Sequence, residues 1–275
     1  RFASSAGDLA GLAAELEAAG EGDGEIVVQA VAQGALERAQ AVFCHGRLVA
    51  AHAYRQLAEG AGGGDAVKES VSRPQVRTHL ARLGARLRWH GALSVDYILQ
   101  DGRGLQDGRG LQDGRGLQDG PGSGAVPLYI DCNPRLVEPM NALFAEVDLA
   151  GLLVAVSLGG SPAEAPASRP GVRTHMAGQG LAGCALRGGG RAALLAEAWR
   201  LWRRRGPYAG SREELTPVGL DAFSLLPLAY FALRLFADPG GAARLTRQVA
   251  QAHQLNPAAV RIIRETIEAV PPVPG

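Results

Sequence analysis

Two stretches of alternating apolar and polar residues, separated by a short repeat, constrain the fold of this chain more than any other feature. The stretches are Gly91–Gln100 (GALSVDYILQ) and Val126–Asn133 (VPLYIDCN). Alternation with a period of two is typical of strands that have one buried face. The segment between them repeats the unit LQDGRG from Leu99 to Gly120, and a stretch so rich in Gly and Asp buries little surface. We therefore predict a β-hairpin whose connecting loop is expanded by the repeat.

Other segments of the chain show the periodicity of helices or strands. Helices are predicted where apolar residues recur every three or four positions, at Asp8–Ala19, Pro74–Trp89, Val147–Leu158 and Ala192–Arg204. Strands are predicted at Glu25–Ala32, Leu36–Cys44 and Arg47–Tyr54, and a His45-Gly46 turn would join the last two. We therefore predict an α+β fold with an antiparallel sheet in residues 1–159, a linker rich in Ser, Pro and Ala at 160–170, and an all-helical domain at 171–275. The capping-box form of Ser211–Glu214 indicates a helix start in that domain.

Composition and charge exclude several classes of protein. With 47% hydrophobic and 20% charged residues the chain is globular, and a net charge of +1 gives no reason to expect nucleic acid as a partner. The three cysteines are widely spaced and form no CxxC motif, so neither disulfides nor a thiolate zinc site is expected, and a reducing cytoplasm fits best. The most apolar stretch, Leu220–Ala237, contains Asp221, Pro227 and Arg234, which favours a buried or partner-docking helix over a membrane span.

A ten-residue pattern occurs twice in the chain. Ser72–Ala81 has the sequence SRPQVRTHLA, and Ser168–Ala177 has the sequence SRPGVRTHMA. The similarity predicts two similar helix starts, and a shared anion-binding role for the Arg and His side chains is the alternative.

The residues Tyr129–Arg135 (YIDCNPR) carry the strongest signal for chemistry. Alternate residues of a strand share a face, so Asp131 and Asn133 are expected to point the same way, and Ile130 and Cys132 are expected to point into the core. A carboxylate and an amide oxygen side by side are ligands that Mg²⁺ prefers, with other positions left for water and phosphate.

The neighbouring strand supplies a second carboxylate. Apolar side chains fill one face of Gly91–Gln100, which leaves Asp96 on the other face. If the two strands pair, Asp96 lies beside Asp131 and Asn133, and three oxygen ligands converge. Carboxylates held so close repel one another unless a cation lies between them. The spacing alone equally allows an Asn-Pro turn capped by an Asp, with Asp96 as an unrelated solvent-facing residue.

The order of these segments resembles the C-terminal lobe of ATP-grasp enzymes, the group that includes biotin carboxylase, carbamoyl-phosphate synthase and D-alanine ligases. The family pattern is an adenine-hinge strand, a Gly-Glu turn, strands ending near a basic residue, a helix, a strand with an acid, and then E-x-N-P-R. The counterparts in this sequence are, in order, Val28–Gly34, Glu37, Arg55, the helix from Pro74, Ser94–Tyr97 and Asp131–Arg135. The resemblance spans about residues 1–159.

This resemblance implies an ATP-grasp ligase that uses ATP and Mg²⁺ (or Mn²⁺) to activate a carboxylate as an acylphosphate, which an amine or another nucleophile then captures. The partners would be small-molecule carboxylate and nucleophile substrates, with neither nucleic acid nor a membrane, and the helical tail would support a homo-oligomer. The implied metal ligands are Asp96, Asp131 and Asn133; the implied catalytic residues are Arg135 and Arg55; the main chain at Gln29, Ala30 and Val31 would bind adenine, and Glu37 the ribose hydroxyls.

The sequence departs from the family pattern in three places. Asp131 stands where the family commonly has Glu, and Ala30 stands where the hinge often has Glu. No lysine pair and no glycine-rich phosphate loop precede Gln29, and Lys68 comes too late to replace them and is expected at the surface. We therefore expect a piece that lacks the start of the ATP-grasp domain and is inactive alone. A non-catalytic scaffold with a degenerate lobe is the alternative.

Overall fold

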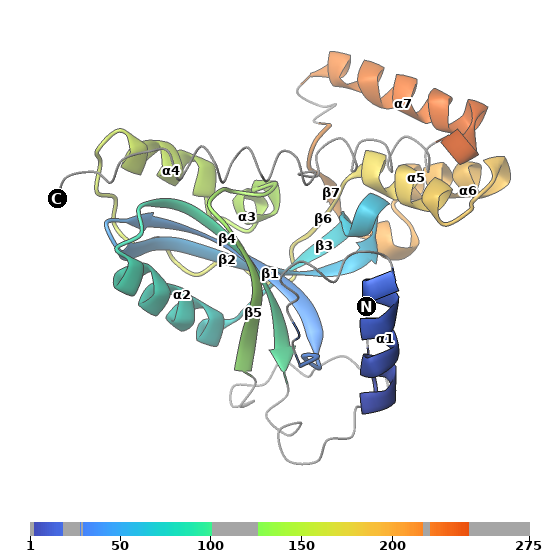
Figure 1. The fold of residues 1–275 in the computed structure, drawn as a ribbon. Helices are drawn as coiled ribbons and strands as arrows, with labels where there is room; N and C mark the ends of the chain where they lie inside the picture. Colours follow the sequence, from blue (N-terminus) through green and yellow to red (C-terminus); the bar gives the residue numbers. More distant parts are fainter. Residues whose placement is uncertain (1–2, 19–27, 29, 101–125, 217–220, 242–275) are drawn as a thin grey trace, which may run out of the picture. The chain divides into compact units, whose positions relative to one another are not determined.

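A computed structural model describes residues 3–18, 28, 30–100, 126–216 and 221–241 (Figure 1). The chain divides into two units, residues 1–33 and residues 34–275. The first unit contains α1 (Ala6–Ala18), which confirms the first predicted helix, and no residue of this helix is buried. The described residues between 28 and 33 form no strand, so the strand predicted at Glu25–Ala32 is wrong for the part that can be described.

The second unit is built around one sheet with the strand order β5-β4-β1-β2-β3-β6-β7. The strands are β1 (Ala35–Cys44), β2 (Arg47–Glu59), β3 (Asp65–Val71), β4 (Gly91–Gln100), β5 (Val126–Asn133), β6 (Arg173–His175) and β7 (Arg212–Glu213). Neighbours are antiparallel except β6 and β7, which are parallel. The antiparallel sheet predicted from sequence is therefore confirmed for its main strands.

Both predicted hairpins form. The turn between β1 and β2 is His45-Gly46, whose φ values of 47° and 89° are both positive, as a two-residue hairpin turn requires. The antiparallel pairing of β4 with β5 confirms the second hairpin. The LQDGRG repeat that joins these two strands lies outside the described residues. Sequence reasoning missed β3, because its charged residues hide the alternation.

Helices cover both faces of this sheet (Figure 1). We call the side that carries α2 (Pro74–Leu87) the α2 face, and the side that carries α3 (Met140–Phe144) and α4 (Leu149–Ser157) the α4 face. On the α2 face the helix buries Val76 and Leu80 against apolar strand residues. Gly84 allows this approach, because a Cβ there would lie 2.2 Å from the Phe43 ring.

A smaller core on the α4 face anchors the two short helices. Ala142, Leu149 and Val156 pack against apolar residues of β1 and β2 such as Val42 and Val49. Asp148 caps α4 by accepting a hydrogen bond from the Gly151 N–H, which satisfies one of the free donors of the first turn. The helix predicted at Val147–Leu158 is confirmed.

The C-terminal segment continues the sheet before it turns helical. Its helices are α5 (Ala177–Leu186), α6 (Arg191–Arg203) and α7 (Leu225–Ala237), with short 3-10 turns η2 (Gly206–Tyr208) and η3 (Ala222–Ser224); another, η1 (Ala61–Gly63), precedes β3. Because β6 pairs with β3 on one side and with β7 on the other, residues 171–275 are not all-helical as predicted. The capping-box prediction at Ser211–Glu214 is also wrong, since Arg212–Glu213 forms β7.

Two further expectations concern the ends of this segment. Residues 160–170 were expected to be a linker, and in the structure the Ala165 N–H donates to the Val49 carbonyl at 2.7 Å, so part of this segment lies against the sheet. In α7 only Leu235 is buried, although the stretch is strongly apolar. Within the described ranges, no helix has both the length and the apolar character that a membrane span needs.

Candidate functional site

The three predicted metal ligands lie on the same face of the sheet. The register of β4 with β5 places Asp96 opposite Asp131 and Ser94 opposite Asn133. Residues directly opposite each other on antiparallel strands project to the same side, so these positions form two adjacent cross-strand rows. The register therefore places Asp96 beside Asp131 on one face, with Asn133 in the next row, and their role as metal ligands stays a prediction.

One short contact joins Asn133 to Asp131, and another joins Asp96 to β1. The Asn133 Nδ2 donates to Asp131 Oδ2 over 2.6 Å. Arg38 is the β1 partner of Asp96, and its Nε lies 3.4 Å from Asp96 Oδ2. The same guanidinium donates from Nη1 to Asp65 Oδ1 at 2.7 Å. One cation is therefore divided between two carboxylates, and no ion pair holds Asp131 in the part of the chain that is described.

The electrostatics of the pair indicate an excess of negative charge. Partial burial raises the pKa of Asp96, Arg38 opposes that rise, and the nearby charge of Asp131 adds to it. A carboxylate whose neighbour disfavours its charged form is stabilised by a bound cation. Asp131 is exposed on β5, which is the last strand of the sheet, so phosphate and water can reach the pair.

The donor set suits a hard divalent cation. Two carboxylates and one amide oxygen are ligands of the kind that Mg²⁺ takes, with water and phosphate completing its coordination. The amide nitrogen of Asn133 now faces Asp131, and turning the amide over would present Oδ1 instead, because the two orientations occupy the same space. The residues present therefore fit Mg²⁺ or Mn²⁺.

Two neighbours of these ligands do not lie where the alternation predicted. Ile130 is 56% exposed and Cys132 is also exposed, so the expectation that both point into the core is wrong. The register shifts between Asp96 and Tyr97, which leaves Ile130 as an extra residue on the edge strand. Such a bulge breaks the strict alternation, and an edge strand has less to pack against.

Arg135 lies at the end of this row of ligands. Its backbone N–H donates to the Asn133 carbonyl over 2.8 Å, which closes the turn after β5. The side chain is exposed, and its guanidinium forms no ion pair with any described residue. A guanidinium in this state can accept a phosphoryl or carboxylate oxygen pair.

Glu37 lies on the other side of the sheet. It is 2% exposed, and its carboxylate accepts hydrogen bonds from Arg73 at 2.6 and 2.7 Å and from the Tyr97 hydroxyl at 2.8 Å. Its register partner on β4 is Tyr97, whereas Asp96 projects to the α4 face. The expectation that Glu37 faces a nucleotide together with the metal ligands is not met, because its oxygens are already used within the α2 face.

Arg55 shares the side of Glu37, which is its register partner on β1. Its guanidinium donates to Glu69 Oε2 from Nη2 at 2.7 Å and from Nε at 3.1 Å. Arg55, for which a catalytic role was predicted, therefore lies on the opposite side of the sheet from Asp96.

The predicted adenine-binding residues belong to the first unit. Gln29 lies outside the described residues, and Ala30 and Val31 are exposed and form no strand. Their role stays a prediction.

A buried lysine on the α4 face was missed. Lys68 is 1% exposed, so its expected surface position is wrong. Its Nζ lies 2.9 Å from Glu214 Oε2 and 3.4 Å from Glu138 Oε2, and 4.9 Å from the centre of the Tyr54 ring. The available signal was its rarity, since it is the single lysine in a chain whose other basic residues are arginines. Its position on β3, itself unpredicted, hid the burial.

A neutral histidine extends this cluster inward. His52 is 1% exposed, and its Nε2 lies 2.8 Å from Asn141 Oδ1. Burial lowers the pKa of His52 to about 4, so the ring is neutral near pH 7 and donates to the amide oxygen. Asn141 in turn donates to Thr174 Oγ1 at 2.7 Å, which links β2, α3 and β6. These contacts hold the segment after Arg135 over the α4 face.

Charge on this face is unbalanced among the described residues. Arg38 and Lys68 are the cationic partners of four carboxylates, those of Asp65, Asp96, Glu138 and Glu214. Asp131 adds a fifth carboxylate beside Asp96. Five carboxylates therefore share two paired bases, and the exposed Arg135 guanidinium, two residues after Asn133, is a further cation.

Comparison with known proteins gives a partial likeness. No model of a protein family matches the chain, and no curated protein sequence does. Among solved structures, the chain is similar to the biotin carboxylase subunit of pyruvate carboxylase, with 10% identity over 50% of this chain and 28% of that chain, at a TM-score of 0.34. It is also similar to the biotin carboxylase of Campylobacter jejuni in its β,γ-ATP complex, with 13% identity over 53% of this chain and 30% of that chain, at a TM-score of 0.34.

The likeness covers about half of this chain, and this chain spans less than a third of those proteins. At TM-scores this low, no activity or ligand of those proteins can be assigned to this chain.

Proposed function

We propose that this chain carries the metal-binding part of an Mg-ATP-dependent ligase of the ATP-grasp type. The observation that carries the proposal is the pairing of Asp96 with Asp131 across β4 and β5, with Asn133 in the next row. Three oxygen ligands on one open edge, next to a surplus of carboxylates, are what a divalent cation requires.

Each residue of the row has a separate task in this proposal. Asp96, Asp131 and Asn133 would hold the cation, which supplies charge neutralisation to a nucleotide phosphate when bound. Arg38 keeps Asp96 in place through its 3.4 Å ion pair. Arg135, exposed one turn later, would bind a phosphoryl oxygen or the substrate carboxylate.

The reaction that fits these groups is phosphoryl transfer to a carboxylate. The carboxylate oxygen attacks the γ-phosphorus, the bond from that phosphorus to the bridging oxygen breaks, and ADP leaves with the electron pair. An amine or another nucleophile then displaces phosphate from the acylphosphate. No side chain has to form a covalent bond, so the row of ligands and Arg135 would contribute positioning and charge neutralisation.

The remaining expectations are carried forward as parts of the same proposal. Substrates would be a small carboxylate and a nucleophile, and the exposed apolar side chains of α7 would support a homo-oligomer. The three cysteines are free, which agrees with the cytoplasm as the proposed location.

The test is cation binding by the full 275-residue chain. Titration with Mn²⁺, followed by the loss of its free electron paramagnetic resonance signal, is expected to show one site. Asp131→Asn removes one charged ligand at constant shape, so its Mn²⁺ affinity is expected to fall about tenfold or more. Glu164→Gln is the matched control, because Glu164 is an exposed carboxylate paired with Arg77 at the surface.

Isothermal titration calorimetry with Mg-ATP separates the two functions that the sequence allowed. Weaker Mg-ATP binding in Asp131→Asn than in Glu164→Gln supports the ligase. If the unmodified chain binds no Mn²⁺, or if Asp131→Asn binds as well as the control, the metal site is refuted and the non-catalytic scaffold is the better description.

A further inference from the structure

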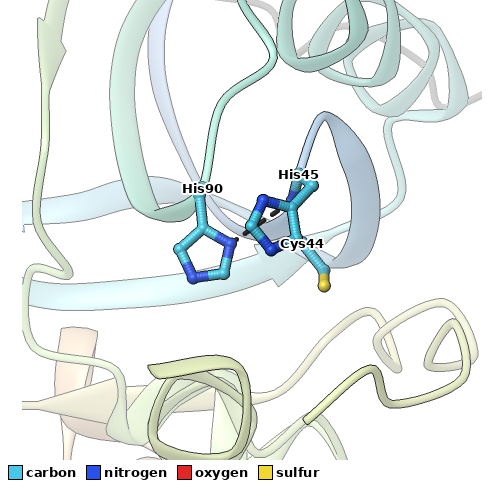
Figure 2. Close-up of side chains that lie close together, drawn as sticks. All are labelled: Cys44, His45 and His90. Atoms are coloured by element: carbon cyan, nitrogen blue, oxygen red, sulfur yellow. Dashed lines mark hydrogen bonds between the residues drawn. The ribbon is translucent and has the colours of Figure 1, made fainter. Parts of the chain in front are cut away.

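Three side chains with sulfur and nitrogen donors meet at the turn between β1 and β2 (Figure 2). Cys44 is the last residue of β1, His45 follows in the turn, and His90 directly precedes β4. The Cys44 Sγ and one ring nitrogen of each histidine all lie within 4.8 Å of one another. Asp96 is five residues beyond Gly91 along β4, or about 16 Å away, so this cluster is separate from the oxygen ligands.

The backbone holds these three residues together. The Gly46 N–H donates to the Trp89 carbonyl at 2.7 Å, which ties the turn to the loop before β4. Phe43 and Gly91 are register partners, so the residues that follow and precede them stay adjacent. The His45 and His90 rings stack with centres 4.4 Å apart and an angle of 28°. The donors are therefore placed by paired strands and do not depend on a loose loop.

The present contacts of the donors are weak. The Cys44 thiol has the Gly160 carbonyl at 3.8 Å and the Ser161 hydroxyl at 3.9 Å, which is long even for sulfur. The backbone N–H of His45 donates to His90 Nδ1 at 3.3 Å, near the limit for such a bond. A cation bound at Nδ1 would replace this long hydrogen bond, and one bound at Nε2 would require the ring proton to move to Nδ1.

The donor chemistry selects a borderline-soft cation. Zn²⁺ binds thiolate at about 2.3 Å and imidazole at about 2.0–2.1 Å, so tetrahedral ligands lie roughly 3.4–3.7 Å apart. The three donors lie within 4.8 Å of one another, so shifts of about an ångström at each side chain would bring them to that spacing. The Cys44 side chain is buried while both imidazoles are exposed, which leaves an outward position for water.

We propose that Cys44, His45 and His90 form a binding site for Zn²⁺ or a cation of similar softness. Binding releases the thiol proton and leaves three protein ligands and one open position. The site is independent of the proposed ligase function, because oxygen ligands select Mg²⁺ while sulfur and nitrogen ligands select zinc-like ions. The bound cation would lock the β1–β2 turn to the loop that follows α2.

Cobalt(II) titration of the full chain tests this site, because Co²⁺ reports its ligands by absorption. One equivalent is expected to produce a near-ultraviolet thiolate-to-cobalt band and intense visible bands of four-coordinate cobalt, both displaced by Zn²⁺. His90→Gln alters only an exposed side chain, so it is expected to keep the fold and to weaken Co²⁺ binding about tenfold or more. Cys44→Ser is expected to abolish the thiolate band.

Two controls make the outcome decisive. Cys184→Ser removes a different, partly buried cysteine and is expected to keep the band. Asp131→Asn is also expected to keep it, which separates this site from the oxygen ligands whether or not the ligase proposal holds. The proposal is overturned if the unmodified chain gives no thiolate band, if the band survives Cys44→Ser, or if His90→Gln binds Co²⁺ as tightly as the unmodified chain.

Discussion

Glu37 on the α2 face and Asp96 on the α4 face differ in how well their charges are matched by donors. On the α2 face, Glu37 is buried and its carboxylate is fully used by Arg73 and Tyr97. On the α4 face, Asp96 shares one guanidinium with another acid and has the charge of Asp131 beside it. A buried acid with matched donors contributes to folding, whereas an accessible acid pair with too few donors is suited to bind a cation. In our proposal the same residue types therefore serve stability on one face and cation binding on the other.

Removing the Glu37 carboxylate from the α2 face should have the largest effect on stability. Glu37→Gln removes the carboxylate charge that the buried Arg73 guanidinium contacts at 2.6 Å, and we expect the free energy of unfolding to fall by about 3–5 kcal/mol. Chemical denaturation of the variant and of the unmodified chain measures this. A loss below about 1 kcal/mol would contradict the view that this pair is sealed from solvent.

Like Glu37 on the α2 face, His52 on the α4 face is buried, and its burial should make the stability depend on pH. Burial lowers the pKa of His52 to about 4 from about 6.5, so the unfolded chain binds the extra proton first. The stabilisation is fully present above pH 6.5 and is lost as the pH falls from 6.5 to 4, by about 3 kcal/mol. Denaturation series across this range measure it.

His175 shares this pH window, because burial lowers its pKa to about 4 as well. The comparison is therefore made with His52→Gln, whose stability should change less steeply between pH 6.5 and 4 than that of the unmodified chain. Equal slopes in the two proteins would show that His52 can take up a proton without unfolding.

Cation binding at the α4 face should stabilise the unmodified chain more than a variant that lacks one predicted ligand. At Mn²⁺ concentrations of 100 times the dissociation constant, the unmodified chain should gain about 2.7 kcal/mol in unfolding free energy. Asp131→Asn should gain much less at the same concentration, because one ligand is missing. Thermal unfolding with and without Mn²⁺ reports both values, and equal gains would place the bound ion elsewhere.

The smallest effect is expected for Asp131→Asn without a cation. Removing a carboxylate beside Asp96 relieves repulsion at an exposed position, so unfolding free energy should change by no more than about 0.5 kcal/mol, towards greater stability. Denaturation in the presence of a chelator measures this. A clear loss of stability would mean that Asp131 is needed for folding, in contrast to the role proposed for it.

The repeated pattern shows how far local sequence can lead. Pro74 begins α2, while the matching Pro170 precedes β6, so the prediction of two helix starts holds for the first copy only. Gln75 in the first copy is replaced by Gly171, whose φ of 80° does not belong to a helix. In the second copy, β6 forms instead and pairs with the edge of β3, with Arg173 opposite Glu69. A shared anion-binding role is not supported either, because the arginines of the two copies contact carboxylates.

Local sequence determined the strands that carry the candidate site. The bounds predicted from alternation, Gly91–Gln100 and Val126–Asn133, are those of β4 and β5, and the alternation placed Asp131 and Asn133 on one face. This works because the direction of alternate side chains depends only on the extended backbone. The bulge at Ile130 limits this prediction, because an extra residue on an edge strand cannot be recognised from the sequence pattern.

Only the tertiary structure decided which groups share a face and which are buried. Alternation assigns Glu37 and Asp96 to faces of their own strands, but the register of β1 with β4 sets them on opposite sides of the sheet. The burial of Lys68 and the meeting of Cys44 with His90 likewise depend on strands and loops distant in sequence. Side-chain direction is a local property of the backbone, whereas the partner of each side chain is set by long-range pairing and by the helices that cover each face.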